Sequence, residues 1–266
     1  MEGNSGIATT LVQVVFYLLV VVILYYFYKY LFARETTNSA MLVDSSRQAD
    51  ADAGGEIVVS SANMPRLYEG GEFTVSMWIY INNWSYRQTY NKHILSIGGQ
   101  NFDTLRVYLA PDKNNLNVRV HTAESGSTTN TDSTTSLSAS QRTTLFSNVQ
   151  TGAQTIEGSG GCGINEIDMQ RWVNVVISLN GRTCDVYIDG KLSRSCVLPS
   201  FYKVDPNGYN ATLLSNGGFG GFIAGVSIHD SALNPDSIYK NYIAGPEPVN
   251  NIAEWFKSFF EPKRIV

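Results

Sequence analysis

The longest uninterrupted pattern in the chain is an apolar run close to its first residue. Residues 7–28 carry no charged side chain, and only Thr9, Thr10 and Gln13 interrupt the hydrophobic and aromatic positions. A helix of this length extends about 33 Å, against about 30 Å for the hydrocarbon layer of a bilayer. The run also lacks the polar stripe of a helix that packs on a soluble core. It predicts one transmembrane helix within residues 1–33.

The residues that follow the apolar run are typical of a membrane–water interface. They are aromatic and basic, and the predicted anchors are Tyr25, Tyr26, Tyr28, Lys29, Tyr30 and Arg34. A cleaved signal peptide would have basic residues ahead of the run, where Glu2 is the only charged side chain. Since the basic flank lies on the C-terminal side, the positive-inside rule places the larger part of the chain on the cytoplasmic face.

Beyond the run the pattern changes twice. Residues 34–56 are small and polar without a sustained period, as expected for a tether. From residue 57 onward apolar and polar positions alternate, which is typical of strands, and the clearest strand is residues 70–82. Further strands are predicted at residues 57–60, 93–97, 105–109 and 116–120.

The second half of the chain repeats the strand pattern after a long interruption. Residues 122–163 are rich in Ser, Thr and Gly, and their length indicates either a functional excursion or a solvated loop. In residues 171–197, Asn180-Gly181 and Asp189-Gly190 separate three strands and predict two tight hairpin turns. Residues 217–242 predict a last strand and then a short helix that begins at Asn234-Pro235.

Composition agrees with an all-β class and narrows the partners. The chain has 15 Tyr and 23 Gly, and no long helical period outside the first run. Only 16% of its residues are charged, its net charge is −4, and no basic stripe is present, so nucleic-acid binding is not expected.

Three blocks of residues resemble the laminin-G-like, concanavalin-A-like jelly-roll families. They are the strand Phe73–Ile79, the hairpin from Trp172 to Lys191, and the closing strand and helix from Gly221 to Leu233. The resemblance implies an all-β, two-sheet antiparallel jelly-roll sandwich over residues 57–248, with residues 122–163 as an insertion. One departure is that Ala224 and Gly225 stand where the families often carry acidic residues, so a ligand role of those acids does not transfer.

No motif in the chain predicts catalysis or a cofactor. The segment Glu166-Ile167-Asp168-Met169-Gln170 resembles the catalytic strand of glucanases in the same superfamily, but Gln170 replaces the carboxyl group that must donate and reclaim a proton. The three histidines are far apart and belong to no metal-ligand pattern. We therefore expect no enzyme activity, no cofactor and no metal, although a calcium or glycan site at the rim of the sandwich stays open.

Three cysteines cannot all pair within one chain. Cys184 and Cys196 flank the Asp189-Gly190 turn, and one bulged residue in that turn would place them directly opposite each other, within disulfide range. In that register Ile188 would face Leu192. A turn without a bulge would place Cys184 opposite Ser195 instead. The sequence thus predicts a Cys184–Cys196 disulfide in the first register and leaves Cys162 free.

The last residues, 249–266, form an amphipathic tail. Five apolar side chains at helical spacing predict one face of a short helix: Ile252, Trp255, Phe256, Phe259 and Phe260. A helix of about ten residues is not stable alone in water. Its apolar face is therefore expected to bury against the sandwich, a partner protein or the membrane interface.

The arrangement of span, tether and jelly roll suggests two functions. It is similar to that of membrane-anchored minor capsid proteins of large icosahedral DNA viruses, which implies a structural protein that docks capsid proteins onto an internal membrane of the virion. The alternative is a membrane-anchored, lectin-like receptor or adhesin with its jelly roll outside the cell. The alternative predicts glycosylation of the sequons at Asn83 and Asn210, which would stay unmodified in the cytosol. A cytosolic domain would also disfavour a disulfide unless a virus or a compartment supplies its own oxidant.

Overall fold

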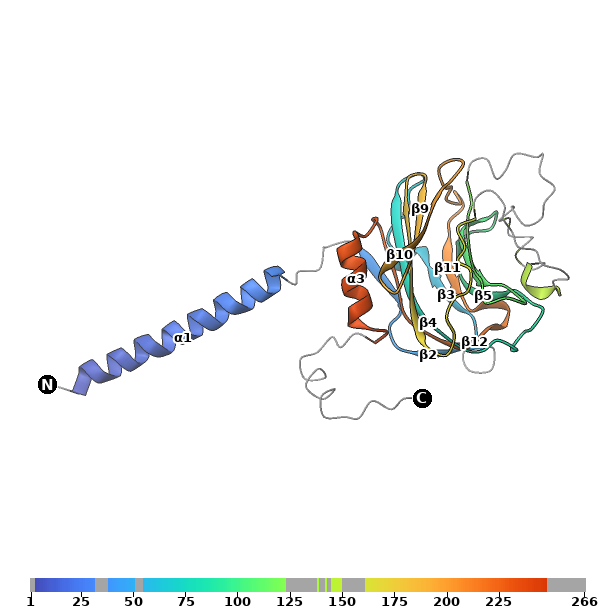
Figure 1. The fold of residues 1–266 in the computed structure, drawn as a ribbon. Coiled ribbons are helices and arrows are strands. Elements are labelled where there is room, and N and C mark those ends of the chain that lie inside the picture. Colours follow the sequence, from blue (N-terminus) through green and yellow to red (C-terminus); the bar gives the residue numbers. More distant parts are fainter. Residues whose placement is uncertain are drawn as a thin grey trace. The chain divides into compact units, whose positions relative to one another are not determined.

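The computed structural model describes residues 3–31, 38–50, 55–122, 138, 142, 145–149 and 161–247. The chain divides into two units, residues 1–36 and residues 37–266, and each is described by itself (Figure 1). The predicted amphipathic tail, with Ile252, Trp255, Phe256, Phe259 and Phe260, lies outside the described residues.

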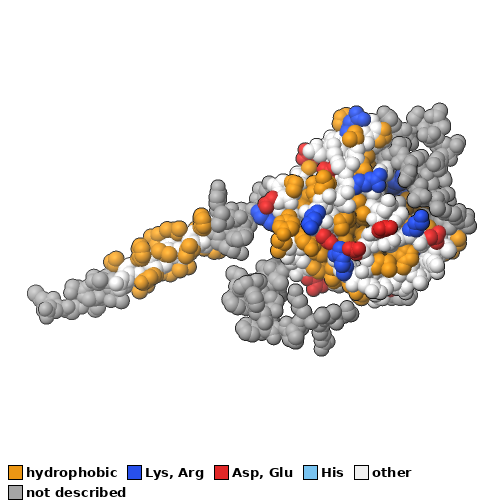
Figure 2. Space-filling model, in the orientation of Figure 1, with side chains coloured by type: hydrophobic (Ala, Val, Ile, Leu, Met, Phe, Trp, Pro, Cys, Tyr) orange, Lys and Arg blue, Asp and Glu red, His pale blue; other side chains and the backbone are white. Residues whose placement is uncertain are grey.

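The first unit contains one helix, α1 (Gly3–Leu31). Large apolar side chains are exposed at nearly every position from Val12 to Phe27, and because these positions are consecutive they lie on all sides of the helix. Figure 2 shows such side chains along the visible face of the helix. Over the residues whose side chains are described, no helix is long and apolar enough to cross a membrane. The predicted transmembrane span is therefore not confirmed.

Two of the predicted interface anchors can be placed on this helix. Tyr25 and Tyr26 are exposed, and their rings meet edge to face with centroids 5.6 Å apart. The side chains of Tyr28, Lys29 and Tyr30, and the whole of Arg34, lie outside the described part.

The second unit is a two-sheet antiparallel β-sandwich, which confirms the predicted all-β class. The seven-stranded sheet has the order β1-β12-β4-β8-β9-β10, with β2 also paired to β12, and the five-stranded sheet has the order β3-β11-β5-β6-β7. The strands are β1 (Ser39–Val43), β2 (Arg47–Asp50), β3 (Ile57–Ser60), β4 (Glu72–Asn83), β5 (Lys92–Gly98), β6 (Asp103–Leu109), β7 (Leu116–Val120), β8 (Trp172–Asn180), β9 (Thr183–Ile188), β10 (Lys191–Val197), β11 (Asn210–Leu213) and β12 (Gly218–His229). Two short 3₁₀ helices, η1 (Ser61–Asn63) and η3 (Ser215–Gly217), lie in the connections.

The core lies between the sheets and follows the alternation seen in the sequence. In β4, Phe73, Val75, Met77 and Ile79 are fully buried between the two layers. The intervening residues face away from this core, and each fully buried apolar side chain contributes roughly 1.5–3 kcal/mol to stability. Thr74 shows the alternation on the other face, where its hydroxyl donates to the carbonyl oxygen of Ser231 at 2.8 Å.

A short helix covers part of the outer face of the seven-stranded sheet. α3 (Pro235–Ala244) begins as predicted: the side-chain oxygen of Asn234 accepts from the backbone N–H of Ser237 at 2.7 Å, and Pro235 occupies the first turn. Ile238 of this helix is buried with Val176 and Tyr187 of the sheet. Proline has no backbone N–H, and the cap accepts from the N–H of Ser237, so two positions of the first turn leave no unpaired donor.

A segment ahead of β8 closes one side of the sandwich. At the free edge of β7, the N–H of Cys162 donates to the oxygen of Val118 at 2.9 Å, and the N–H of Ile164 donates to the oxygen of Leu116 at 2.8 Å. Cys162 is also bonded to Cys196 of β10, in the other sheet. Residues 161–164 thus connect an edge of each sheet, and we call them the edge segment.

The predicted Cys184–Cys196 disulfide is wrong, as is the prediction that Cys162 is free. Cys184 does lie directly opposite Cys196, but the bulge falls between Leu192 and Arg194 rather than in the turn, so Ile188 faces Lys191 and not Leu192. The edge segment brings Cys162 to Cys196, and Cys184 keeps a buried thiol. The bond depends on a strand pairing between residues far apart in the chain, which the local pattern around the turn does not contain.

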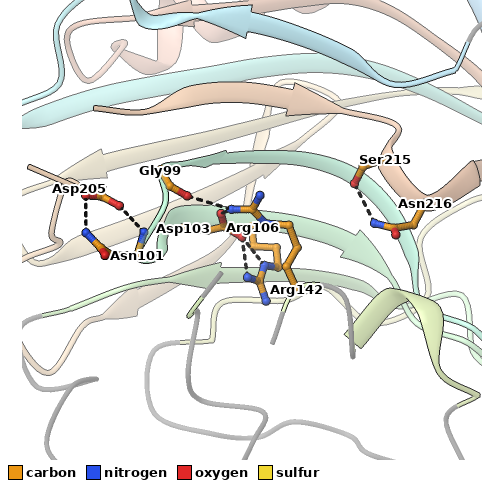
Figure 3. Close-up of polar contacts among 8 residues, drawn as sticks. All are labelled: Gly99, Asn101, Asp103, Arg106, Arg142, Asp205, Ser215 and Asn216. Carbon is orange, nitrogen blue, oxygen red and sulfur yellow. Dashed lines mark hydrogen bonds and ion pairs between the residues drawn. The ribbon is translucent and has the colours of Figure 1, made fainter. Parts of the chain in front are cut away.

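Part of the 122–163 insertion packs on the outer face of the five-stranded sheet. Arg142 and the β6 residue Arg106 both form ion pairs with the buried carboxylate of Asp103 (Figure 3). Phe146 is fully buried, with its ring 4.9 Å from that of His93 and 5.6 Å from that of Tyr108. These described residues of the insertion therefore belong to the folded unit.

Candidate binding surface

Three aromatic side chains form a row across the outer face of the seven-stranded sheet. Phe222 of β12, Tyr80 of β4 and Trp172 of β8 are direct cross-strand partners. The ring of Tyr80 lies 6.1 Å from that of Phe222 and 5.7 Å from that of Trp172, both edge to face. All three side chains are half-buried, so each keeps exposed ring surface. We call Phe222, Tyr80 and Trp172 the aromatic row.

Strand periodicity explains why these rings share one face. Tyr80 has the same parity in β4 as Thr74 and Trp78, so it points away from the sandwich core. Nearer the centre of the sheet, Trp78 is covered, because its ring stacks on that of Tyr242 in α3 at 5.8 Å. The aromatic row lies one cross-strand row further along, where Gln48 of β2 pairs with Phe222 and is itself exposed.

Charged side chains lie beside the Trp172 end of the row. Arg171 forms ion pairs with Asp168 and Asp189, and its Nη2 lies 2.6 Å from Asp189 Oδ2. Hydrogen bonds to Asp189 and then to Asp168 raise the pKa of the Arg171 guanidinium above its ordinary value. We call Asp168, Arg171 and Asp189 the charged rim, which holds two carboxylates for one guanidinium.

The turn that carries Asp189 is the one predicted from Asp189-Gly190. Both residues have positive φ, 51° and 74°, as the tight hairpin turn requires. A Cβ on Gly190 would lie 3.1 Å from the ring of Tyr239 in α3, so glycine also allows the helix to approach. The turn is therefore held in place, and the Oδ1 of Asp189 accepts from the N–H of Asn174 at 2.9 Å.

The segment that resembles a glucanase strand enters this rim but does not form a strand. Glu166 and Gln170 both have φ of 58°, which belongs to turns rather than to an extended strand. The N–H of Gln170 donates to the oxygen of Ile81 at 2.8 Å, and Asp168 is paired with Arg171. The structure thus gives these residues the role of a loop entering β8.

The histidines do not come together. His93 is buried against Phe146, His121 stacks on Phe102 with ring centroids 4.1 Å apart, and His229 lies 3.2 Å from the hydroxyl of Ser227. Within the described ranges, no group of three or more His, Cys, Asp or Glu side chains could hold a metal ion.

Sequence reasoning did not find the aromatic row. Trp172 and Tyr80 lie in strands that the alternation predicts, but only the pairing of β12 with β4 and of β4 with β8 brings the three rings together. The available signal was an aromatic residue at an outward position of a strand, where a polar residue is usual in a solvated sheet face.

Comparisons with known proteins show no sequence relative. No family model and no curated protein matches the chain. Among solved structures the chain is similar to the botulinum neurotoxin serotype D binding domain, at 15% identity over 79% of this chain and 47% of that one, with a TM-score of 0.49. It is also similar to the receptor binding domain of the C/D mosaic serotype, at 14% identity over 78% and 46%, with a TM-score of 0.48.

A third similar structure is the serotype D ligand binding domain in complex with N-acetylneuraminic acid, at 15% identity over 79% of this chain and 47% of that one, with a TM-score of 0.46. The chain spans about half the length of these solved chains. At this identity and these TM-scores the likeness assigns neither a family nor a function to the chain.

Proposed function

We propose that the chain is a non-enzymatic binding protein that recognises a glycan with the aromatic row and the charged rim. The observation that carries this proposal is the row of three half-exposed rings on a sheet face that α3 covers only in part. A single exposed aromatic residue needs no explanation, whereas three adjacent ones form a flat apolar strip with polar groups at one end.

The chemistry of a sugar matches such a strip. The face of an aromatic ring carries partial negative charge, and the C–H groups on one face of a pyranose present partial positive charge and apolar surface to it. The hydroxyl groups around the sugar can then bond to the carboxylates and guanidinium of the charged rim. The aromatic row lies on three paired antiparallel strands, so little order has to be gained there on binding.

The charged rim supports binding rather than hydrolysis. A glycosidase needs one carboxyl group that stays protonated until it gives its proton to the leaving oxygen. The two rim carboxylates, Asp168 and Asp189, instead both form ion pairs with the one guanidinium of Arg171, so neither stands as a free acid facing an open site. We therefore propose that the protein has no glycosidase activity.

We further propose that α1 anchors the protein in a membrane and that the sandwich faces an oxidising compartment. The exposed apolar side chains on all sides of α1 support the first part. The Cys162–Cys196 disulfide supports the second, because such bonds persist outside the reducing cytosol. This orientation is the reverse of the one that the basic flank of the apolar run predicts.

The structural role remains a second candidate. A minor capsid protein that docks other capsid proteins on an internal membrane would need the same anchor, and a virus that supplies its own oxidant would also form the disulfide. The sequons separate the candidates, since Asn83 and Asn210 are both exposed. A mobility shift after endoglycosidase treatment supports the receptor, and recovery of unshifted protein with purified particles supports the capsid role.

The glycan proposal is tested with the full chain in detergent on immobilised neutral, sialylated and sulfated glycans. Trp172→Ala should weaken binding about tenfold or more, which corresponds to about 1.4 kcal/mol. The matched control is Tyr68→Ala, because Tyr68 is an exposed aromatic residue (65%) that is not part of the row. Equal binding by the two variants, or no binding of wild-type protein to any glycan, would overturn the proposal.

A further inference from the structure

All three cysteines of the chain lie at the side of the sandwich that the edge segment closes. Cys162 and Cys196 form the disulfide, with Cα atoms 5.9 Å apart. Cys184 is the cross-strand partner of Cys196, and the sulfur of Cys162 lies 3.4 Å from the backbone oxygen of Cys184. Side chains of directly opposed residues leave a sheet on the same face. A third sulfur is therefore placed beside an existing bond.

The geometry also allows the alternative bond. Directly opposed residues in an antiparallel pair have Cα atoms about 4.5–5.5 Å apart, within the range of disulfides. Both strands of this pair, β9 and β10, belong to one hairpin whose register is fixed by the turn and the bulge. Cys184 and Cys196 could thus be bonded with the hairpin in its present register.

We propose that the three cysteines form a thiol–disulfide exchange site, in which Cys184 attacks Cys196 and displaces Cys162. The Cys184 thiol first loses its proton, and the thiolate then forms a bond to the sulfur of Cys196. The Cys162–Cys196 bond breaks in the same step, and Cys162 leaves as a thiolate that takes up a proton. One disulfide replaces another, so no oxidant or reductant is consumed.

The exchange would break the covalent link between the edge segment and β10. In the present state this segment is held by backbone hydrogen bonds to β7, by the disulfide, and by the guanidinium of Arg194, whose Nη1 donates to the oxygen of Gly163 at 2.8 Å. After exchange the segment would be held by these hydrogen bonds and by the packing of Cys162 and Ile164 against the core, without a covalent bond. The site would then control whether the two sheet edges are joined covalently.

The folded protein keeps the exchange slow. Cys184 is fully buried, and burial, with a smaller contribution from Asp185, raises the pKa of its thiol to about 12. The thiolate is the attacking species, so a protonated thiol does not react. Exchange therefore requires local opening at the edge segment, which sub-denaturing urea or a partner that displaces the segment would supply.

Labelling of the free thiol tests the proposal. The full chain is held in detergent in sub-denaturing urea, alkylated at intervals, fully unfolded and digested with trypsin. Cleavage after Arg and Lys places the three cysteines in different peptides, residues 143–171, 183–191 and 195–203. The label should begin on the peptide with Cys184 and move with time to the peptide with Cys162.

Two variants make the outcome decisive. Cys184→Ser should retain the Cys162–Cys196 bond and show no free thiol at any time. Cys162→Ser should form a Cys184–Cys196 bond when it is oxidised in air. If the wild-type label stays on Cys184 throughout, or moves to Cys196, the proposed exchange does not occur. Since the wild-type experiment needs no variant, a failure of either variant to fold leaves the test intact.

Discussion

The burial of His93 predicts how the stability of the sandwich depends on pH. His93 is fully buried in β5, its Nδ1 accepts from the N–H of Ser215 at 3.1 Å, and its ring packs edge to face on Phe146. Among the described residues, nothing bonds to its Nε2. Burial first, and then the positive charges of Arg106 and Arg142, lower the pKa of His93 from 6.5 to about 3.

The direction of the effect follows from the protons bound in each state. Between about pH 3 and 6.5 the unfolded chain carries a proton on His93 that the folded chain does not. The free energy of unfolding therefore rises with pH in this window. The contribution of His93 to stability is fully present above about pH 6.5 and is lost as the pH falls toward 3. With these two pKa values the loss between pH 7 and pH 5 is about 2 kcal/mol.

Urea unfolding of wild-type protein and His93→Asn at pH 7, 6 and 5 measures this contribution. An asparagine oxygen can replace Nδ1 as the acceptor but does not titrate, so the packing lost with the ring lowers stability equally at every pH. The wild type should lose about 2 kcal/mol more than the variant from pH 7 to pH 5. Equal losses in both proteins would show that His93 accepts its proton in the folded state and would refute the reasoning.

Three further predictions concern separate parts of the chain. Asp103→Ala removes the buried carboxylate that pairs with Arg106 and Arg142 and should cost about 3–5 kcal/mol in urea unfolding. Asp236→Ala, which removes an exposed ion pair with Lys240, should cost less than about 1 kcal/mol. A small effect of Asp103→Ala would mean that water reaches the ion pairs of Asp103 with Arg106 and Arg142. Alkaline carbonate extraction should leave the full chain with the membrane pellet, and release into the supernatant would contradict an anchor at α1. Gln170→Glu should give no hydrolysis of β-glucan, because the carboxylates nearby are paired with Arg171; turnover by the variant or the wild type would contradict the non-enzymatic proposal.

The parts of the fold that the sequence predicts are those that local geometry determines. The alternation in β4 places Phe73 and Ile79 in the core, and Asn234 with Pro235 begins a helix, because each depends on residues within one strand or one turn. The Asp189-Gly190 turn is predictable for the same reason. The bulge between Leu192 and Arg194 is not predictable in this way, because its position is not set by the residues of the turn itself.

The candidate site was less predictable because it depends on strand order. Trp172 lies more than 90 residues beyond Tyr80 in the chain, and their contact requires β8 to pair with β4 across the whole insertion. The Cys162–Cys196 bond likewise requires residues 161–164 to pair with β7. Hydrophobic periodicity gives the face of a strand but not its neighbour, so adjacency of this kind has to come from the structure.

The edge segment has a consequence for how copies of this protein behave toward one another. An open strand edge is a template on which another chain can add a strand. Here residues 161–164 occupy the outer edge of β7. β10, which the disulfide connects to the same segment, carries Lys191, Arg194 and a bulge that disfavour strand addition. Reduction of the disulfide would weaken the cover over β7 first, so chemical reduction at high protein concentration is expected to produce strand-paired aggregates that grow from that edge.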